Sequence, residues 1–417
     1  MPRWRAPPRL LSRLLSLILL SWALLPAAPS RAQAPADALR VKLGVLTDLS
    51  GVYADATGTG SVLAVRMAAE DCLAAECRGM AVDVVSADHQ NKPDVALATA
   101  RRWVDQDGVD ALIDMSNAAI QLAVAPFAAQ KDRVALFAGG TARLTGDACQ
   151  PAHIVQWMWD THVQVAGVAR RLTRPGTSWF LVAADYAFGH QFEADAKAVV
   201  EAAGGRVAGG VRHPFPSGDL SAYLLQARAS GADIVAFANA GADTVNAIKT
   251  AAEFGLGRGG KPRLVALYLS VLDVRGLGLA AAAGTVLSEG FYWDLDEGTR
   301  RFAARFLARH GAVPSQIQAG LYSATLHYLR AVAAEGGKAA RPAIRRMHRL
   351  PIADDVVRRA RLRPDGRMVH DWYVFEVKRP DESRGPWDLY RVVDTVPGER
   401  AFRPLDAGGC PRLLAED

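Results

Sequence analysis

The stretch VKLGVLTDLSGVYADATGTGSVLAVRM, residues 41–67, has the pattern of a buried strand, a polar loop and a helix. Apolar residues alternate from Val41 to Val45, as in a strand of a parallel sheet. Ligands of open α/β sheets bind beyond the carboxyl ends of strands, where helix N-termini present free N–H groups. We therefore predict that Ser50, Gly51 and Tyr53, in the loop after this strand, bind a ligand.

The same strand, loop and helix unit recurs along the chain. Further strands are predicted at residues 81–87, 111–115 and 134–137, and then at residues 179–182, 207–211, 234–239 and 264–269. Right-handed crossovers join such units into parallel sheets with helices on both faces. Two antiparallel strands are predicted near the end of the chain, at residues 372–377 and 389–393.

Residues 1–32 have the features of a secretory signal peptide. Arginines precede an apolar run from Leu14 to Leu25, and a small-x-small cleavage site ends at Ala32. Cleavage leaves about 385 residues, enough for two lobes, and lowers the formal net charge from +6 to about +1. This charge does not favour nucleic-acid binding. The first cysteine after the leader is Cys72, so we expect a soluble periplasmic protein without a lipid anchor.

Four cysteines exported to an oxidising compartment favour disulfides. Three pairings are possible for Cys72, Cys77, Cys149 and Cys410. We favour Cys72 with Cys77, which are close in sequence, and Cys149 with Cys410, which would tie the C-terminal tail to the first lobe. No metal is expected, because no CxxC motif is present and no histidine stands at ligand spacing beside a cysteine.

Seven segments spread over the chain together resemble one family. They are residues 41–67, SADHQNKPDVA (86–96), TARLTGDAC (141–149), ADYAFG (184–189), FANAGADTVNAIK (237–249), EGFYWD (289–294) and DGRMVHDWYVFEVK (365–378). The chain resembles the branched-chain amino acid/amide class of periplasmic solute-binding proteins, which deliver ligands to ABC importers.

The resemblance implies a type I periplasmic binding protein fold, an α/β fold of two Rossmann-like lobes with parallel sheets. Three crossovers, near residues 158, 290 and 345, would form the hinge. Lobe 1 would comprise residues 38–158 and 290–345, and lobe 2 residues 159–289 and 346–417, with a tail that can return to lobe 1. The implied partners are a small-molecule ligand and an ABC permease of the inner membrane, and the protein is expected to be a monomer.

Polar and small residues follow the next two predicted strands of the first lobe. These candidate ligand-binding residues are Ser116, Asn117, Ala118, Gly140 and Thr141. Hydroxyl groups and helix N–H groups at these positions suit a carboxylate, although each polar residue can equally be an ordinary helix N-cap. The resemblance implies that Ser116 and Thr141 hold the carboxylate of the ligand.

The second lobe contributes candidates at its own strand ends. They are Asp185, Tyr186, Phe188, Asn239, Ala240 and Gly241. Phe188 precedes Gly189 where the amino-acid receptors of the family have a tyrosine. Five aromatic residues can either line a pocket for a flatter solute or pack in the core: Tyr53, Tyr186, Phe188, Tyr268 and Tyr292. An amino acid, an amide and an aromatic acid all stay open as ligands.

Enzymatic alternatives lack a motif. The glycine pattern that starts at Gly58 has Leu63 where a dinucleotide fingerprint needs its third glycine. No GxSxG, HExxH or P-loop occurs, so we predict neither catalytic residues nor a cofactor. The alternatives to an importer receptor are a receptor for a periplasmic sensor or enzyme system and, less favoured, an exported α/β enzyme.

Overall fold

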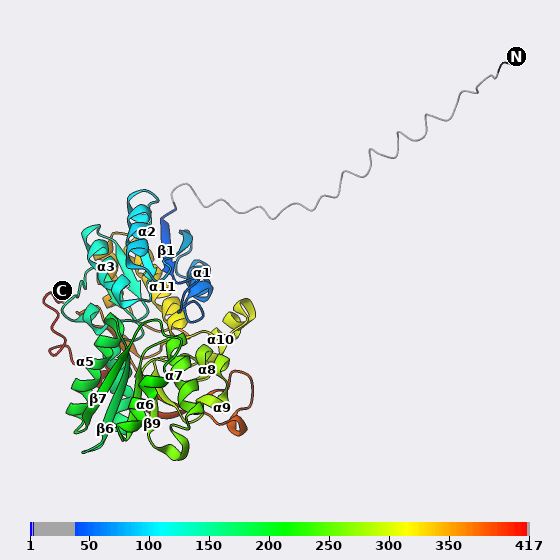
Figure 1. Ribbon diagram of the computed structural model, residues 1–417. Coiled ribbons are helices and arrows are strands. Elements are labelled where there is room, and N and C mark those ends of the chain that lie inside the picture. The colour runs from blue at the N-terminus through cyan, green and yellow to red at the C-terminus, as the bar shows by residue number, and fades with distance from the viewer. Residues whose placement is uncertain (2, 4–37, 415–417) are drawn as a thin grey trace. The chain divides into compact units, whose positions relative to one another are not determined.

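The computed structural model describes residues 1, 3 and 38–414. The predicted signal peptide therefore lies, apart from residues 1 and 3, outside the described residues. The chain from Leu39 onward forms one compact unit, built around two β-sheets (Figure 1).

The first sheet has five parallel strands in the order β2-β1-β3-β4-β5. The strands are β1 (Arg40–Thr47), β2 (Ala81–Asp88), β3 (Ala111–Asp114), β4 (Val134–Phe137) and β5 (Ile154–Gln156). The crossover helices are α1 (Gly58–Ala74), α2 (Pro93–Asp105) and α3 (Ala118–Gln130), and a 3₁₀ turn, η1 (Ala142–Thr145), follows β4. β3 and β4 are buried throughout, as expected for central parallel strands.

The second sheet has seven strands in the order β14-β13-β10-β9-β8-β6-β7. Its parallel strands are β6 (Ser178–Ala184), β7 (Arg206–His213), β8 (Ile234–Ala238), β9 (Arg263–Ala266) and β10 (Val286–Glu289). β13 (Trp372–Val377) and β14 (Tyr390–Val396) are antiparallel, as predicted. The helices of this region are α4 (Thr161–Leu172), α5 (Ala187–Ala202), α6 (Ser221–Ala229), α7 (Ala242–Glu253), α8 (Val271–Leu277) and α9 (Leu279–Ala282). The α/β fold with two mainly parallel sheets is thus confirmed.

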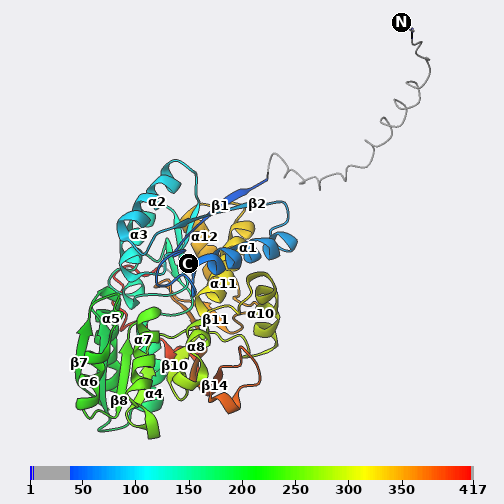
Figure 2. The same cartoon turned by 45° about the vertical axis from the view of Figure 1, so that its right-hand side comes forward.

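Three later helices pack beside the first sheet. They are α10 (Glu297–His310), α11 (Gln316–Glu335) and α12 (Ala340–Arg349). α11 packs on α1, where the Tyr322 hydroxyl donates to Asp71, and Figure 2 shows α12 beside α11. A hairpin of β11 (Ala360–Leu362) and β12 (Met368–His370) follows, and its turn residue Gly366 accepts a hydrogen bond from the Gln156 N–H at the edge of the first sheet.

The segments that connect the two sheets meet at Gly290. A β-carbon at this position would lie 2.5 Å from Cε1 of His370 and 2.7 Å from Sδ of Met158. His370 Nε2 also makes a 2.7 Å hydrogen bond to the Met158 carbonyl. The chain segments after β5, after β10 and before β13 therefore touch one another.

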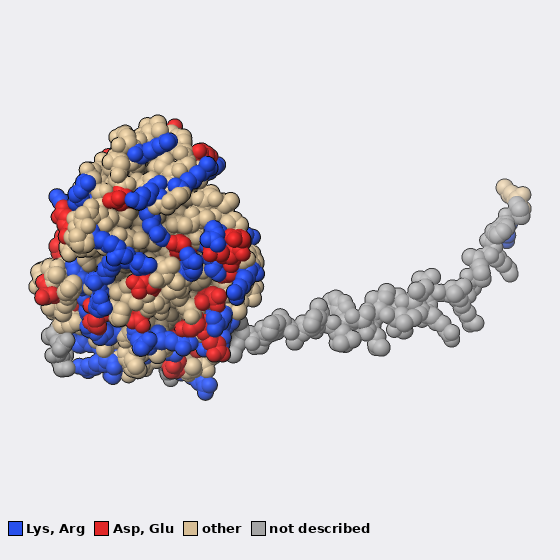
Figure 3. Space-filling model, turned by 90° about the horizontal axis from the view of Figure 1, so that it is seen from below, with Lys and Arg blue, Asp and Glu red and all other residues tan. Residues whose placement is uncertain are grey.

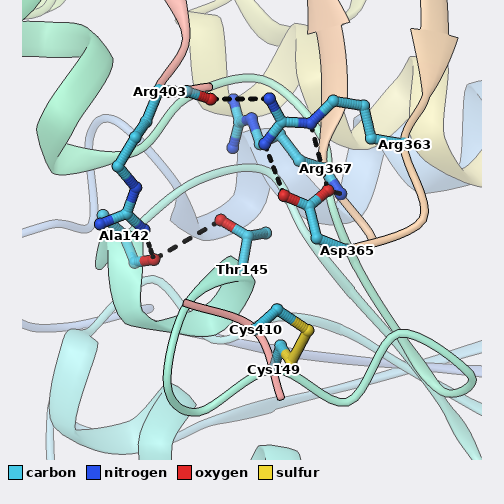
Figure 4. Close-up of a disulfide and its surroundings, with 8 residues drawn as sticks. All are labelled: Ala142, Thr145, Cys149, Arg363, Asp365, Arg367, Arg403 and Cys410. Carbon is cyan, nitrogen blue, oxygen red and sulfur yellow. Dashed lines mark hydrogen bonds and ion pairs between the residues drawn. A yellow bond between two sulfur atoms is a disulfide. The ribbon is translucent and has the colours of Figure 1, made fainter. Parts of the chain in front are cut away.

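Both favoured disulfides are present, Cys72–Cys77 and Cys149–Cys410. Figure 4 shows the second disulfide, together with hydrogen bonds that join its neighbourhood to the C-terminal tail. Arg403 donates to the Ala142 carbonyl at 3.2 Å, and Arg363 donates to the Arg403 carbonyl at 2.7 Å. The tail thus lies against the loop that follows β4.

The surface carries charges of both signs. Lysine and arginine side chains are interspersed with aspartate and glutamate on the face shown in Figure 3. Within the part of the chain that the structure describes, no helix is both long and apolar enough to cross a membrane.

Candidate functional site

A small cavity of about 30 Å³ lies at the carboxyl ends of strands from both sheets. It is lined by Tyr53, Ala56, Ser116, Asn117, Ala118, Gly139, Gly140, Trp159, Tyr186, Phe188, Ala240, Tyr268 and Ile317. Loops after β1, β3 and β4 supply the first-sheet side, and loops after β6, β8 and β9 supply the second. A crevice at strand ends is where open α/β sheets bind ligands.

The loop after β3 brings the start of α3 to the cavity. Asn117 caps this helix, because its side-chain oxygen accepts hydrogen bonds from the N–H groups of Ala119 and Ile120. The hydroxyl of Ser116 donates to the buried carboxylate of Asp114. Ala118, the first residue of α3, therefore presents the positive end of the helix beside the cavity.

The loop after β4 approaches the cavity through two glycines. A β-carbon on Gly140 would lie 1.9 Å from Oε1 of Gln121, and one on Gly139 would lie 2.1 Å from Nε1 of Trp159. Only glycine fits these two close approaches. Gln121 also donates to the Gly139 carbonyl at 2.5 Å, which holds the loop in place.

Aromatic side chains form most of the remaining wall. Trp159, after β5, lies with its ring centroid 5.1 Å from that of Tyr268 and 6.1 Å from that of Phe188. Tyr186 lies 6.0 Å from Phe188. These distances are typical of tilted and edge-to-face aromatic contacts.

Tyr53 and Tyr186 link the two sides of the cavity. Their hydroxyl groups form a short hydrogen bond, and Phe215 stacks on Tyr186 with a centroid distance of 4.2 Å. Burial raises the pKa of both phenols, so both stay protonated at physiological pH. Tyr53 also lines an outer groove with Gly51 and Gly241, which places its ring between the groove and the cavity.

The described residues that line the cavity include no acidic or basic side chain. Asp114 lies behind Ser116, and burial raises the pKa of its carboxyl group. Glu289, at the end of β10, is also buried, and burial raises its pKa well above the usual value. The electrostatics of the cavity therefore depend on dipoles and neutral donors.

Eight of the predicted ligand-binding residues line the cavity, and six lie elsewhere. The eight are Tyr53, Ser116, Asn117, Ala118, Gly140, Tyr186, Phe188 and Ala240. The six are Ser50, Gly51, Thr141, Asp185, Asn239 and Gly241. Tyr292, predicted as a possible aromatic wall, lies outside the cavity lining and stacks on Tyr390.

Local hydrogen bonds explain the positions of several of these six residues. Thr141 caps η1 by accepting the Arg143 N–H, and Ser50 donates to Asp88 at 2.6 Å. Asp185 pairs with His190. Asn239 accepts from the Thr244 hydroxyl within the second lobe.

Four residues line the cavity although they were not predicted to bind a ligand: Trp159, Gly139, Ala56 and Ile317. Trp159 follows a strand of three residues, too short for a periodic signal in the sequence. Without a predicted strand before it, nothing in the sequence marked Trp159 as a strand-end residue.

Asp48, Asp88 and His89 are close enough to be considered as metal ligands. Asp48 instead accepts the N–H groups of Gly51 and Tyr53, and Asp88 accepts that of Gln90. Nδ1 of His89 accepts a backbone N–H at 3.0 Å. These bonds shape the loops after β1 and β2, and we assign no metal to them.

The comparisons with known proteins agree with this geometry. A model of the family described as periplasmic binding protein matches residues 40–385. A periplasmic binding protein from Burkholderia mallei is 40% identical, with 91% of this chain and 100% of that chain covered and a TM-score of 0.83. A branched-chain amino acid ABC transporter periplasmic ligand-binding protein from Burkholderia xenovorans LB400 is 39% identical. The match covers 89% of this chain and 99% of that chain, with a TM-score of 0.81.

More distant structures show a likeness of fold. A solute-binding protein of an ABC transporter from R. palustris, solved in complex with 4-hydroxybenzoate, is 20% identical, with 86% and 97% covered and a TM-score of 0.74. A comparison with curated proteins found no match. The matched family consists of binding proteins, which confirms the prediction that the chain is not an enzyme. The extent of the match, from residue 40 to residue 385, shows that this chain belongs to the periplasmic binding protein family.

Proposed function

We propose that this protein captures a small carboxylate-bearing solute in the cavity and delivers it to an ABC permease of the inner membrane. The supporting observation is that loops at the strand ends of both sheets line one cavity. The similar protein from B. xenovorans is described as a ligand-binding protein of an ABC transporter. The ligand class stays as broad as an amino acid, an amide or an aromatic acid.

In this proposal the protein captures its solute by closing two lobes around it at a hinge. We take residues 38–158 and 290–345 as one lobe and the remaining mature chain as the other, with the tail against the first. A solute that contacts both lobes stabilises the closed state relative to the open state. The contact of Met158, Gly290 and His370 supports this, because a compact crossing of connecting segments allows rotation without unfolding either sheet.

We place the carboxylate of the solute at the start of α3. Ala118 offers a backbone N–H at the positive end of the helix, and Gly140 leaves room for close approach. The Ser116 hydroxyl donates its one hydrogen to Asp114, so in this arrangement it shapes the loop and does not donate to the carboxylate of the solute. Thr141 acts indirectly in this proposal, because it caps η1 and so shapes the loop that carries Gly140.

Export and assembly complete the proposal. Residues 1–32 direct the chain to the periplasm and are then removed. In this proposal the mature protein is a monomer, has no lipid anchor and does not bind nucleic acid. The mixed charges in Figure 3 support the absence of a nucleic-acid surface on that face. N-terminal sequencing of the exported protein should start near Gln33, and a lipid-modified or uncleaved N-terminus would contradict this.

A thermal-shift screen of the mature protein tests the proposed function. The ligands are amino acids, amides, short dicarboxylates and aromatic acids. A solute at a hundredfold excess over its dissociation constant stabilises the native state by about 2.7 kcal/mol, which raises the unfolding midpoint. We expect a selective rise with one class. If no class raises the midpoint and mass spectrometry of the denatured protein finds no copurified solute, the proposal is wrong.

A further inference from the structure

From the chemistry of the cavity wall, we propose that the solute is an aromatic carboxylate without an ammonium group. This inference rests on the proposed function and narrows its ligand class. It depends on three features of the cavity: the absence of an anionic partner, two buried hydrogen-bond donors without partners, and the arrangement of the rings.

An α-amino acid would bring an ammonium group that needs an anion or several acceptors, because burying an unpaired charge is costly. None of the described cavity-lining residues carries a carboxylate. The nearby carboxyl groups of Asp114 and Glu289 lie outside the lining and are themselves buried. Asp114 already accepts a hydrogen bond from Ser116. The cavity therefore disfavours a zwitterion.

Two buried hydrogen-bond donors of the wall have no partner within the protein. They are the indole Nε1–H of Trp159 and the hydroxyl of Tyr268, on side chains that are 5% and 4% exposed. The indole group can only donate. Nε1 lies against Gly139, and Trp159 and Gly139 both line the cavity.

A buried donor without a partner is energetically unfavourable, so a solute that supplies an oxygen acceptor is favoured. The positive end of α3 at Ala118 adds to the preference for an anionic oxygen. Neutral donors and a helix N-terminus together can hold a carboxylate without a basic side chain.

The rings of Trp159, Phe188 and Tyr268 enclose the rest of the space. Trp159 makes a 76° edge contact with Phe188 and a 41° tilted contact with Tyr268. A flat ring can extend this pattern of edges and faces, whereas a branched aliphatic chain presents no such edge. An aromatic carboxylate matches both the rings and the free donors.

Matched ligand pairs test the class directly. Isothermal titration calorimetry of the mature protein uses benzoate, 3-phenylpropanoate, phenylalanine and leucine. Phenylalanine differs from 3-phenylpropanoate by its ammonium group alone. We expect at least one of the two aromatic acids to bind at least tenfold more tightly than either amino acid. Tighter binding of phenylalanine or leucine would overturn the inference and leave the proposed receptor function intact.

A matched pair of tryptophan variants tests the donor. Trp159→Phe keeps a ring but removes the N–H, and we expect it to weaken binding of the preferred aromatic acid about tenfold or more. Trp157→Phe is the control, because the Trp157 N–H donates to Ser323 and the residue does not line the cavity. Thermal unfolding of both variants checks that they fold. Equal affinities of Trp159→Phe and the wild type would contradict the assignment of this donor.

A negative titration is also informative. If none of the four compounds binds, the denatured protein is analysed for a released solute. A released aromatic acid supports the inference, and any other released solute overturns it while supporting the receptor function. If nothing is released and the broader thermal-shift screen is also negative, the proposed function itself fails.

Discussion

Asp195, on α5, is a buried carboxyl group that makes stability depend on pH. One of its oxygens has no hydrogen-bond partner. Burial raises its pKa from the ordinary 3.8 to about 6, and a hydrogen bond from Thr161 offsets part of this rise. The folded protein thus holds a proton on this group at pH values where the unfolded chain has lost it.

We expect the contribution of Asp195 to the free energy of unfolding to fall as pH rises from about 4 to about 6, because this group holds its proton in the folded state and loses it in the unfolded state. The difference between the folded and unfolded pKa of Asp195 corresponds to a change of ~3 kcal/mol in its contribution to the free energy of unfolding. Asp195→Asn should lack this contribution, so its free energy of unfolding should rise relative to that of the wild type as pH increases and be about 1–3 kcal/mol higher at pH 7. Urea unfolding of the wild type and the variant from pH 4 to 7 measures the two free energies of unfolding. The exposed Asp94→Asn is the control, and an unchanged slope in Asp195→Asn would contradict the prediction.

Between elements, the hydrogen bond of Tyr53 with Tyr186 joins the loop after β1 to the start of α5. Its two residues belong to opposite sides of the cavity, so the bond exists only when the sides are close. Phe215, from the segment after β7, stacks on both rings of this pair. We interpret the pair as a latch for the closed state.

Tyr53→Phe should speed dissociation of the solute, because it removes the bond and leaves the Tyr186 hydroxyl without its partner. We expect the dissociation rate to rise about three- to tenfold, as for a neutral hydrogen bond of about 1 kcal/mol, with little change in the association rate. Stopped-flow measurements with the solute selected by the screen test this. Tyr223→Phe, on α6 and outside the cavity lining, is the control. An unchanged dissociation rate in Tyr53→Phe would rule out the latch.

Across the whole molecule, the two disulfides differ in how much chain they close. Cys149–Cys410 joins residues 261 apart, whereas Cys72–Cys77 joins residues 5 apart. In the chain-entropy model these separations correspond to about 5–6 and about 2 kcal/mol of stabilisation. The longer bridge also holds the tail against the loop of η1.

The variant Cys149→Ser/Cys410→Ser should therefore lose more stability than Cys72→Ser/Cys77→Ser, by about 3 kcal/mol. Urea unfolding of the two double-serine proteins gives the comparison, with the short bridge as the matched control. Equal losses would show that the tail contributes no long-range constraint to the unfolded chain.

The sequence by itself determined the elements and the fold class. β4 and β13 have the bounds predicted from the sequence, because alternation of apolar residues is a local property. The general position of the site was also predictable, since parallel topology brings strand ends to one edge of a sheet. Tyr53, Ser116 and Phe188 were identified in this way.

Only the tertiary structure decided which side chains of those loops form the cavity. Thr141 caps η1, and Trp159 enters the wall because Gly139 leaves room for its indole. The pairing of Tyr53 with Tyr186 crosses 133 residues of sequence. Such contacts depend on the packing of distant segments against one another, and no local pattern encodes which face of a loop will be buried.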